Sequence, residues 1–510
     1  MKRLAAFLTA LTLAMAVFAG GTAEAVPANK GETSIMVFER GWVAPDVGTS
    51  TDNPWTKWIV EKSGVNVKWI AVPRNEIQSS LNTMFAAGTA PDLIHDFVRG
   101  TVAYYRAQGV LRPVDDIIEK YSVNYKKYLE QNKALKPYVT FDDGKMWAFS
   151  SVRPIDSIAN HTMWIRKDWL DNLGLKAPDT EEEFFAVADA FAKKDPDRNG
   201  KNDTFAFSAM LAYFPIISQM YFNSGWYVEN GKLELDLFTE RYAAMLAFHK
   251  KAYDSGWLDP EYITDRDRSR QNQLWVTGKA GIAFGGLTPP DLPQLLKNDP
   301  KAEIIVLRPF KTKFGRNGLL EEPLAFRFVG MNEKTKFPEQ SMKLLDWMID
   351  TGWYDLFYGT LGKDHELVNG KIPRRIIDED KWKKFNNYAI DLMLVDNRYM
   401  EPSWIPIMAA SDPVSQQVAK LRQQALEVQM MDKYRKDLPY DPTADELTQF
   451  GAEFGPIQSE ITDKTIIGGP SATVDAAVVR LRSEWKRLGG DKVMQIYNDW
   501  FAKNKSALGF

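Results

Sequence analysis

Short apolar runs typical of β-strands alternate with helical segments over the first part of the chain, and this alternation restricts the fold more than any other feature. Residues 34–38 and 65–72 have the apolar, partly β-branched character of buried strands. Residues 54–61 and 75–86 have helical character, and a third short strand is expected at 91–96. Strands and helices in alternation favour an α/β unit with a mainly parallel sheet, in which ligands bind beyond the carboxyl ends of the strands.

The length of the chain requires a second unit. The chain has 510 residues, and one hydrophobic core rarely grows beyond about 250–300 residues. We therefore expect two lobes with a cleft between them, joined by hinge crossings after Phe149 and within 311–318, and a helical C-terminal region. The predicted boundaries give a first lobe from 26–150 and 320–365 and a second lobe from 151–319 and 366–510.

Residues 1–25 have the pattern of a secretory signal peptide. Two basic residues precede an apolar run, 4–18, that is shorter than the roughly 20 residues needed to span a bilayer, and small residues follow it. Cleavage is expected after Ala25, because Ala23 and Ala25 fit the pockets of signal peptidase. A second small-residue site ending at Ala19 is the alternative.

The composition restricts where the protein can be located and which classes of partner it can bind. The chain has no cysteine, so it can form neither a disulfide nor a lipid-modified N-terminal cysteine. Loss of 1–25 leaves 62 basic and 66 acidic residues, a net charge of −4, which gives no sign of nucleic-acid binding. The sequence therefore predicts a periplasmic protein without a membrane anchor, expected to be a monomer.

Local enzyme motifs are absent from the sequence. It contains no GxSxG, HExxH, GxxxxGK or GxGxxG. The paired carboxylates of a glycosidase need no local motif, so a secreted polysaccharide-acting enzyme is kept as an alternative.

Six short motifs occur in an order found in one protein family. They lie at 88–92, 143–147, 165–174, 178–183, 278–281 and 465–468. Together they resemble the family 1 extracellular solute-binding proteins of ABC transporters, and most closely the LplA-type branch that includes alginate-oligosaccharide-binding proteins. The resemblance implies a two-lobed periplasmic-binding-protein fold, a ligand in the cleft and delivery to a membrane permease pair. The lack of a lipobox cysteine departs from the lipid-anchored members of the family.

The segment 195–204 contains the first half of an EF-hand calcium loop. Asp195, Asp197 and Asn199 stand at alternate positions and Gly200 in the sixth place, where a sharp turn is needed. The twelfth place holds Ala206 rather than the usual glutamate, so a solvated Asp/Asn-rich turn is the alternative. LplA-type proteins carry a structural calcium in the matching loop, and the resemblance places its ligands at Asp195, Asp197, Asn199, Lys201 (through its carbonyl) and Asp203.

Candidate ligand contacts follow from the chemistry of sugars, which present apolar C–H faces and dense hydroxyl groups to aromatic rings and hydrogen-bonding side chains. By position near predicted strand ends or loops the candidates are Arg40, Trp42, His95, Asp96, Trp147, Tyr213, Trp226 and Trp404. Each aromatic residue has an alternative explanation as core packing. Arg40 suits the carboxylate of a uronic acid, with an ordinary salt bridge as its alternative.

These features predict a periplasmic solute-binding protein that captures a carbohydrate, in particular an oligosaccharide, for an ABC importer, with a bound structural calcium. A binding protein for a peptide or another non-sugar solute is the second alternative, besides the enzyme.

Overall fold

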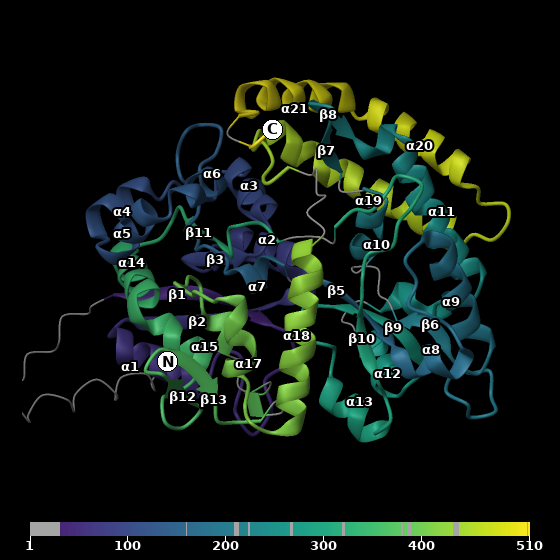
Figure 1. Cartoon of the computed structure of the whole chain (residues 1–510). Helices are drawn as coiled ribbons and strands as arrows, with labels where there is room; N and C mark the ends of the chain where they lie inside the picture. The colour runs from purple at the N-terminus through teal and green to yellow at the C-terminus, as the bar shows by residue number, and fades with distance from the viewer. Residues whose placement is uncertain are drawn as a thin grey trace, which may run out of the picture.

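The computed structural model describes residues 31–159, 161–208, 214–222, 225–265, 269–318, 322–378, 381–382, 384, 389–431, 438–506 and 508–510. The predicted signal peptide and Tyr213 lie outside these ranges. The described chain forms two lobes, each built around its own sheet and its own hydrophobic core (Figure 1).

The first lobe contains a five-stranded sheet in the order β2-β1-β3-β11-β4. Its strands are β1 (Glu32–Glu39), β2 (Asn66–Pro73), β3 (Leu93–Asp96), β4 (Leu111–Arg112) and β11 (Phe328–Asn332). The strands predicted at 34–38, 65–72 and 91–96 are confirmed, and β1 pairs in parallel with β2 and β3. The sheet is mixed rather than mainly parallel, because β11 returns from the second lobe and runs antiparallel to β3 and β4.

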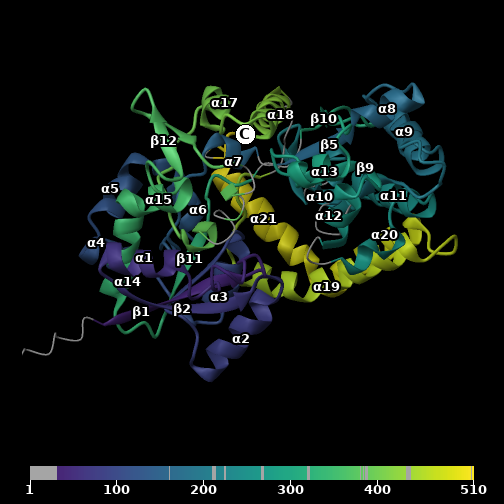
Figure 2. The same cartoon turned by 90° about the horizontal axis from the view of Figure 1, so that it is seen from below.

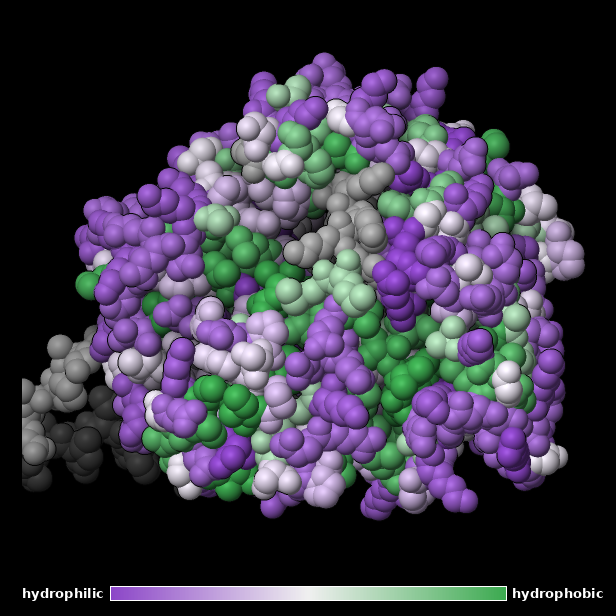
Figure 3. Space-filling model, viewed as in Figure 1, coloured by the Kyte–Doolittle hydropathy of each residue, from purple (hydrophilic) through white to green (hydrophobic). Residues whose placement is uncertain are grey.

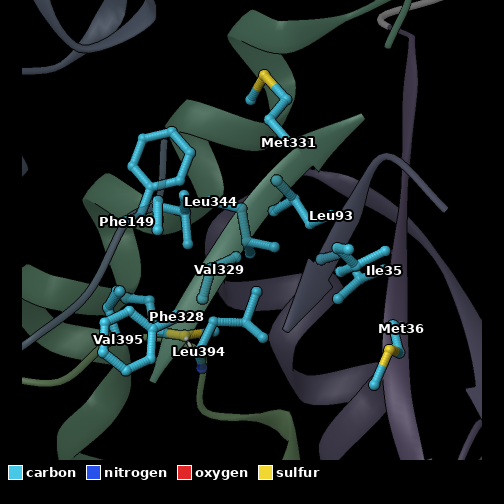
Figure 4. Packing of buried hydrophobic residues seen from close by; sticks show 14 of the residues in the cluster. Ile35, Met36, Leu93, Phe149, Phe328, Val329, Met331, Leu344, Leu394 and Val395 are labelled. Atoms are coloured by element: carbon cyan, nitrogen blue, oxygen red, sulfur yellow. Dashed lines mark hydrogen bonds between the residues drawn. The ribbon is translucent and has the colours of Figure 1, made fainter. Parts of the chain in front are cut away.

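Helices connect the strands of this sheet and pack against it. They are α1 (Pro54–Ser63), α2 (Ile77–Ala87), α3 (Arg99–Ala107), α4 (Asp115–Tyr121), α5 (Asn124–Gln131), α6 (Lys136–Val139), α14 (Pro338–Trp347) and α15 (Trp353–Tyr358). Their apolar side chains complete the core shown in Figure 4, where Leu344 of α14 lies against the strand that carries Val329.

The second lobe contains a four-stranded sheet in the order β10-β5-β9-β6. Its strands are β5 (Thr162–Arg166), β6 (Phe205–Ser208), β9 (Ala280–Gly285) and β10 (Ile304–Leu307). The amphipathic helix α9 (Glu181–Lys193) buries Phe184 and Phe191 in the core beneath this sheet. It starts with the predicted capping box, since Thr180 and Glu183 each accept a hydrogen bond from the other's backbone N–H.

The second lobe also contains further helices and one hairpin. They are α8 (Lys167–Leu173), α10 (Phe214–Met220), β7 (Trp226–Glu229), β8 (Lys232–Leu235), α11 (Glu240–Asp254), α12 (Ser269–Val276) and α13 (Leu292–Asn298).

Two of the chain passages between the lobes lie side by side. Phe149 forms an antiparallel bridge with Val329, and Val152 forms one with Ala325. The first crossing and the returning chain are therefore hydrogen-bonded to each other, which is the arrangement expected of paired hinge segments.

A third passage occurs later than the predicted boundary at residue 366. Residues 389–395 are buried in the core of the first lobe, and Figure 4 shows Leu394 and Val395 next to Phe328. Met400 and Ile405 then pack with the second lobe. The segment 366–510 is therefore divided between both lobes. The apolar run that ends at Val395 has to be buried, but nothing in its sequence indicates in which lobe.

Long helices make up the C-terminal region, as predicted. They are α18 (Pro413–Met431), α19 (Asp445–Ile467), α20 (Val474–Arg487) and α21 (Gly490–Asn504), preceded by the short α17 (Ile405–Met408). Figures 1 and 2 show α19, α20 and α21 as a band over the second lobe that reaches toward the first. Arg106 of α3 contacts Asp445 at the start of α19 at 2.8 Å, so the band joins the two lobes. No described helix is both long and apolar enough to cross a membrane.

Close packing in the second lobe gives a test of this fold. A Cβ added at Gly281 in β9 would lie 2.2 Å from Cδ2 of Phe191 and 2.7 Å from Cε3 of Trp169, and both rings are fully buried. We expect Gly281→Ala to lower the free energy of unfolding by about 1–3 kcal/mol, measured by denaturant titration.

Gly451→Ala is the matched control. A Cβ added at Gly451, which is exposed on α19, would meet no neighbouring atom within 4 Å, so alanine there should leave stability unchanged or raise it slightly. Equal changes in the free energy of unfolding for Gly281→Ala and Gly451→Ala would contradict the close packing of β9 against Phe191 and Trp169.

Candidate functional site: a cleft between the lobes

A cleft with a volume of about 510 Å³ lies between the two lobes. The first lobe contributes Phe97 after β3, Phe326 and the end of α15. The second contributes the segment that follows β9 together with α17 and α18. Figure 3 shows hydrophobic residues gathered near the middle of the molecule, where the halves meet, with a mainly hydrophilic rim. The walls therefore come from strand ends and crossings, as expected for a sheet protein that binds ligands.

Six aromatic side chains line the cleft: Phe97, Phe326, Phe357, Tyr358, Trp382 and Tyr399. Tyr399 is 62% exposed, and its ring touches the edge of Trp404 at 5.7 Å between centroids. Such an exposed ring contributes little to the core of the protein. It can present a flat apolar face to a ligand.

Four arginines and two aspartates are the charged residues of the lining. Arg153 is buried and ties the crossings together, because it donates to the carbonyl oxygens of Ala325 and Phe326, each at 3.1 Å. Burial lowers the pKa of Arg153, and the carboxylate of Glu322 at 3.3 Å opposes that shift. This guanidinium is therefore engaged in holding the hinge.

Arg422 of α18 and Asp156 of the first crossing meet across the cleft wall. Nη2 of Arg422 donates to Oδ2 of Asp156. Oδ1 of Asp156 and Nε of Arg422 are buried without a hydrogen-bond partner in the described structure. Both atoms therefore have unused hydrogen-bonding capacity within the cleft wall.

Arg398 is held by two aromatic rings and one carboxylate. Its guanidinium lies between the rings of Phe326 and Phe357, at 4.7 and 4.5 Å from their centroids. Nε donates to Oδ2 of the buried Asp396 at 3.0 Å. The arrangement fixes the plane and direction of a cationic group in the cleft.

Comparison with known proteins agrees with this architecture. A sequence profile of the bacterial extracellular solute-binding proteins matches residues 44–355. The chain belongs to this family. It is 26% identical over 461 residues, 86% of either chain, to the polygalacturonan/rhamnogalacturonan-binding protein YtcQ of Bacillus subtilis.

Solved structures of two-lobed binding proteins share the fold of this solute-binding protein. The fructooligosaccharide-binding FusA of Streptococcus pneumoniae, in complex with kestose, superposes with a TM-score of 0.73 at 18% identity, over 94% of this chain and 100% of that chain. The alginate-binding protein AlgQ2, without calcium ion, gives 0.72 at 19% identity, over 92% and 97%. The predicted α/β two-lobed fold is confirmed.

Arg40 and Trp42 of the solute-binding protein lie outside the cleft. They border a separate small pocket with Asp391, to which Arg40 is bonded by Nε at 2.7 Å and Nη2 at 3.2 Å. The guanidinium of Arg40 stacks over the ring of Trp42 at 4.6 Å. The structure thus shows Arg40 in the salt bridge that was its alternative interpretation.

His95 and Asp96 lie beneath the cleft at the end of β3. Burial, followed by the charge of Arg327, lowers the pKa of His95 well below its ordinary value, so the ring is neutral at pH 7. Asp96 accepts hydrogen bonds from Thr101 and from the backbone N–H of Phe97, each at 2.7 Å. Asp96 thus supports the position of Phe97, which does line the cleft.

The other three predicted tryptophans lie in three different places, none of them in the cleft lining. Trp147 donates to Asp143 and lies 5.2 Å from the guanidinium of Arg106, near the contact between the lobes. Trp226 is 9% exposed and stacks on Tyr497 of α21, with 4.0 Å between centroids. Trp404 is buried behind Tyr399.

Some of the cleft residues that sequence analysis missed come from the third passage. Arg398 and Tyr399 follow the buried run that ends at Val395, and Trp382 precedes it. A cluster of polar and aromatic residues directly after an apolar run is the one sequence signal by which these residues could have been found.

The loop 195–204 has the curled shape that the sequence predicted. Asp195 accepts hydrogen bonds from the N–H groups of Asn199 and Gly200, each at 3.0 Å, and Gly200 has φ +78°. Nδ2 of Asn199 bridges Asp197 and Asp203 at 2.8 and 3.1 Å. Burial and the neighbouring Asp195 raise the pKa of Asp197.

A lysine side chain reaches the same carboxylates. Nζ of Lys279, just before β9, lies 2.6 Å from Oδ2 of Asp203 and 3.9 Å from Oδ2 of Asp197. Within the described ranges, three or more histidine or acidic side chains nowhere gather closely enough to form a metal site. The loop supplies the oxygen donors that calcium prefers, but its carboxylates are here partly neutralised by an ammonium group.

The stacking of Trp226 on Tyr497 predicts a structural role. We expect Trp226→Ala to lower the free energy of unfolding by about 3–5 kcal/mol, because the indole is part of the second core. Denaturant unfolding measures the change.

Trp42→Ala is the control, since that ring is 47% exposed and should cost far less. If Trp226→Ala lowers the free energy of unfolding by less than Trp42→Ala does, Trp226 is not a core residue.

Proposed function

We propose that this solute-binding protein captures an oligosaccharide in the cleft between its lobes and delivers it to the permease pair of an ABC importer, without changing it chemically. One observation carries the proposal. Both lobes contribute to the walls of one cleft, and those walls contain six aromatic rings together with polar atoms that have unused hydrogen-bonding capacity. Aromatic platforms beside directed polar groups are what sugar rings require. The binding of polygalacturonan, fructooligosaccharide and alginate by the relatives supports the same solute class.

Capture follows from the hinge. A ligand that touches Phe97 on one lobe and the wall after β9 on the other gains more contacts when the lobes approach, so its binding increases the population of the closed form. The permease then distinguishes the loaded form by its shape. Export through a cleaved signal peptide to the periplasm, as an unanchored monomer, is part of the proposal.

Calorimetry and product analysis test this function together. The purified protein is titrated with fructo-, galacturono- and mannuronate oligosaccharides and with a peptide mixture, and each incubation is examined for shorter products. We expect saturable binding of one oligosaccharide class at one site per chain and no cleavage. Release of shorter sugars would establish an enzyme, and saturation by peptides alone would establish a different solute.

Removal of the exposed ring in the cleft should weaken sugar binding. We expect Tyr399→Ala to reduce the affinity for the identified oligosaccharide at least about fivefold, a cost of about 1 kcal/mol or more, because a stacking platform is lost. The melting temperature should stay the same, since the ring is mostly exposed.

Tyr399→Phe keeps the ring and loses only the hydroxyl, which donates to Glu401 at 3.2 Å, and should bind like the wild type. Loss of affinity in both variants, or in neither, would contradict the stacking role.

We also propose that the loop 195–204 binds a structural calcium ion that braces the second lobe. The side chains of Asp195, Asp197, Asn199 and Asp203 and the carbonyl of Lys201 would hold it. Lys279 would have to leave Asp203, because an ammonium group at 2.6 Å competes with a divalent cation.

Calcium should therefore raise the melting temperature of the wild type, since an ion bound only by the folded state stabilises it. Asp197→Ala should abolish the rise, and Lys279→Met should increase it. Melting that is unaffected by calcium or chelator in both the wild type and Lys279→Met would contradict the site.

A further inference from the structure

Arg398 occupies an unusual position for a charged side chain. It lines the cleft, yet only 8% of its side chain is exposed. Two rings enclose the faces of its guanidinium, and Asp396 holds one edge. Burial of this charge costs desolvation free energy. A partner of matching geometry offsets that cost, because the guanidinium is already held in a fixed orientation.

The guanidinium of Arg398 keeps unused hydrogen-bonding capacity beside this ion pair. Nη2 lies 3.0 Å from Oδ2 of Asp396, but the angle makes no hydrogen bond, and this buried nitrogen has no acceptor in the described part of the chain. The side-chain hydrogen bonds of Arg398 are limited there to that from Nε. No described residue accepts a hydrogen bond from Nη1 or Nη2, although the carboxylate of Asp396 forms an ion pair with Nη2.

A carboxylate satisfies such an edge better than a sugar hydroxyl does. Two parallel N–H groups match the two oxygens of a carboxylate in a bidentate, charge-assisted pair. A hydroxyl accepts from one N–H and leaves the other unpaired in a site of low dielectric constant, which is unfavourable.

The charges of the whole lining favour the same ligand. Four arginines and two aspartates line the cleft, and the described lining contains neither lysine nor glutamate. Arg422 adds a second group with an unused donor, because its Nε is buried without a partner among the described residues. Asp156 accepts from Nη2 of Arg422 through Oδ2, and its Oδ1 has no hydrogen-bond partner among the described residues.

We infer that the cleft selects an acidic oligosaccharide and that Arg398 receives the carboxylate of one of its uronic-acid units through Nη1 and Nη2. The inference rests on the proposed function and specifies its substrate class. Arg422 and Asp156 then bind the same chain of sugar units through a donor and an acceptor.

A matched pair of probes tests the substrate class. α-1,4-linked trigalacturonate and α-1,4-linked galactotriose differ only in their carboxylates. Calorimetry at low and at physiological salt should show the acidic trimer bound at least about tenfold tighter, with the preference reduced but not abolished by salt. Trimannuronate serves as a second acidic probe of different stereochemistry.

Arg398→Lys tests the named residue. Lysine keeps a positive charge beside the buried Asp396 but lacks the planar pair of donors, so the preference for the acid should fall at least about fivefold while neutral-sugar affinity changes little. Arg374→Gln is the control, because Arg374 is an exposed arginine next to the lining Arg375, pairs with Glu366 and does not line the cleft. Circular dichroism verifies that each variant is folded.

The outcomes separate the inference from the proposed function. Equal affinity for both trimers, or tighter binding of galactotriose or kestose than of either acidic probe, overturns the inference and leaves oligosaccharide capture intact. Absence of binding to every oligosaccharide contradicts both. If Arg398→Lys still prefers the acidic trimer as strongly as the wild type does, Arg398 is not the residue that binds the carboxylate. If Arg398→Lys does not fold, Arg422→Gln must reduce the preference of the wild type for the acidic trimer, and an unchanged preference contradicts the inference.

Discussion

The hydrogen bonds between the first crossing and the returning chain are the interaction on which the two-lobed structure depends. Phe149 with Val329 and Val152 with Ala325 form a short ribbon, and Arg153 adds donors to the carbonyls that this ribbon leaves unpaired. Because the ribbon is narrow, it resists sliding of the lobes but permits rotation. Because its far end reaches Phe326, any rotation moves one wall of the cleft directly.

Beneath that wall a buried group of charges determines where the first lobe can present its rings. Arg327 is fully buried and donates to the carbonyl oxygens of Ile390 and Asp391, while Nη1 also approaches Nδ1 of His95 at 3.2 Å. Burial lowers the pKa of Arg327 to about 10, which leaves it charged at neutral pH. The 389–395 segment is thereby tied to the end of β3, so the third passage begins from a rigid base.

Features of the chain that depend on local interactions could be predicted from the sequence, whereas the contacts in the cleft could not. The strands of the first sheet, the capping box of α9 and the turn at Gly200 follow from spacing and backbone preference over a few residues. The partner of Arg40 lies 351 positions away, and Trp226 finds Tyr497 only after the C-terminal band has docked. Arg398 and Tyr399 acquire their role from the third passage, whose apolar run resembles any other buried segment.

The contact between α3 and the start of α19 has a consequence for the entropy lost on binding. Arg106 holds Asp445, and Arg99 of the same helix donates to the carbonyl oxygens of Thr140 and Asp441, so the first lobe is attached to the C-terminal band as well as to the ribbon. Two attachments restrict the motions by which the lobes can separate. Fewer such motions mean that less conformational entropy is lost when a solute is enclosed.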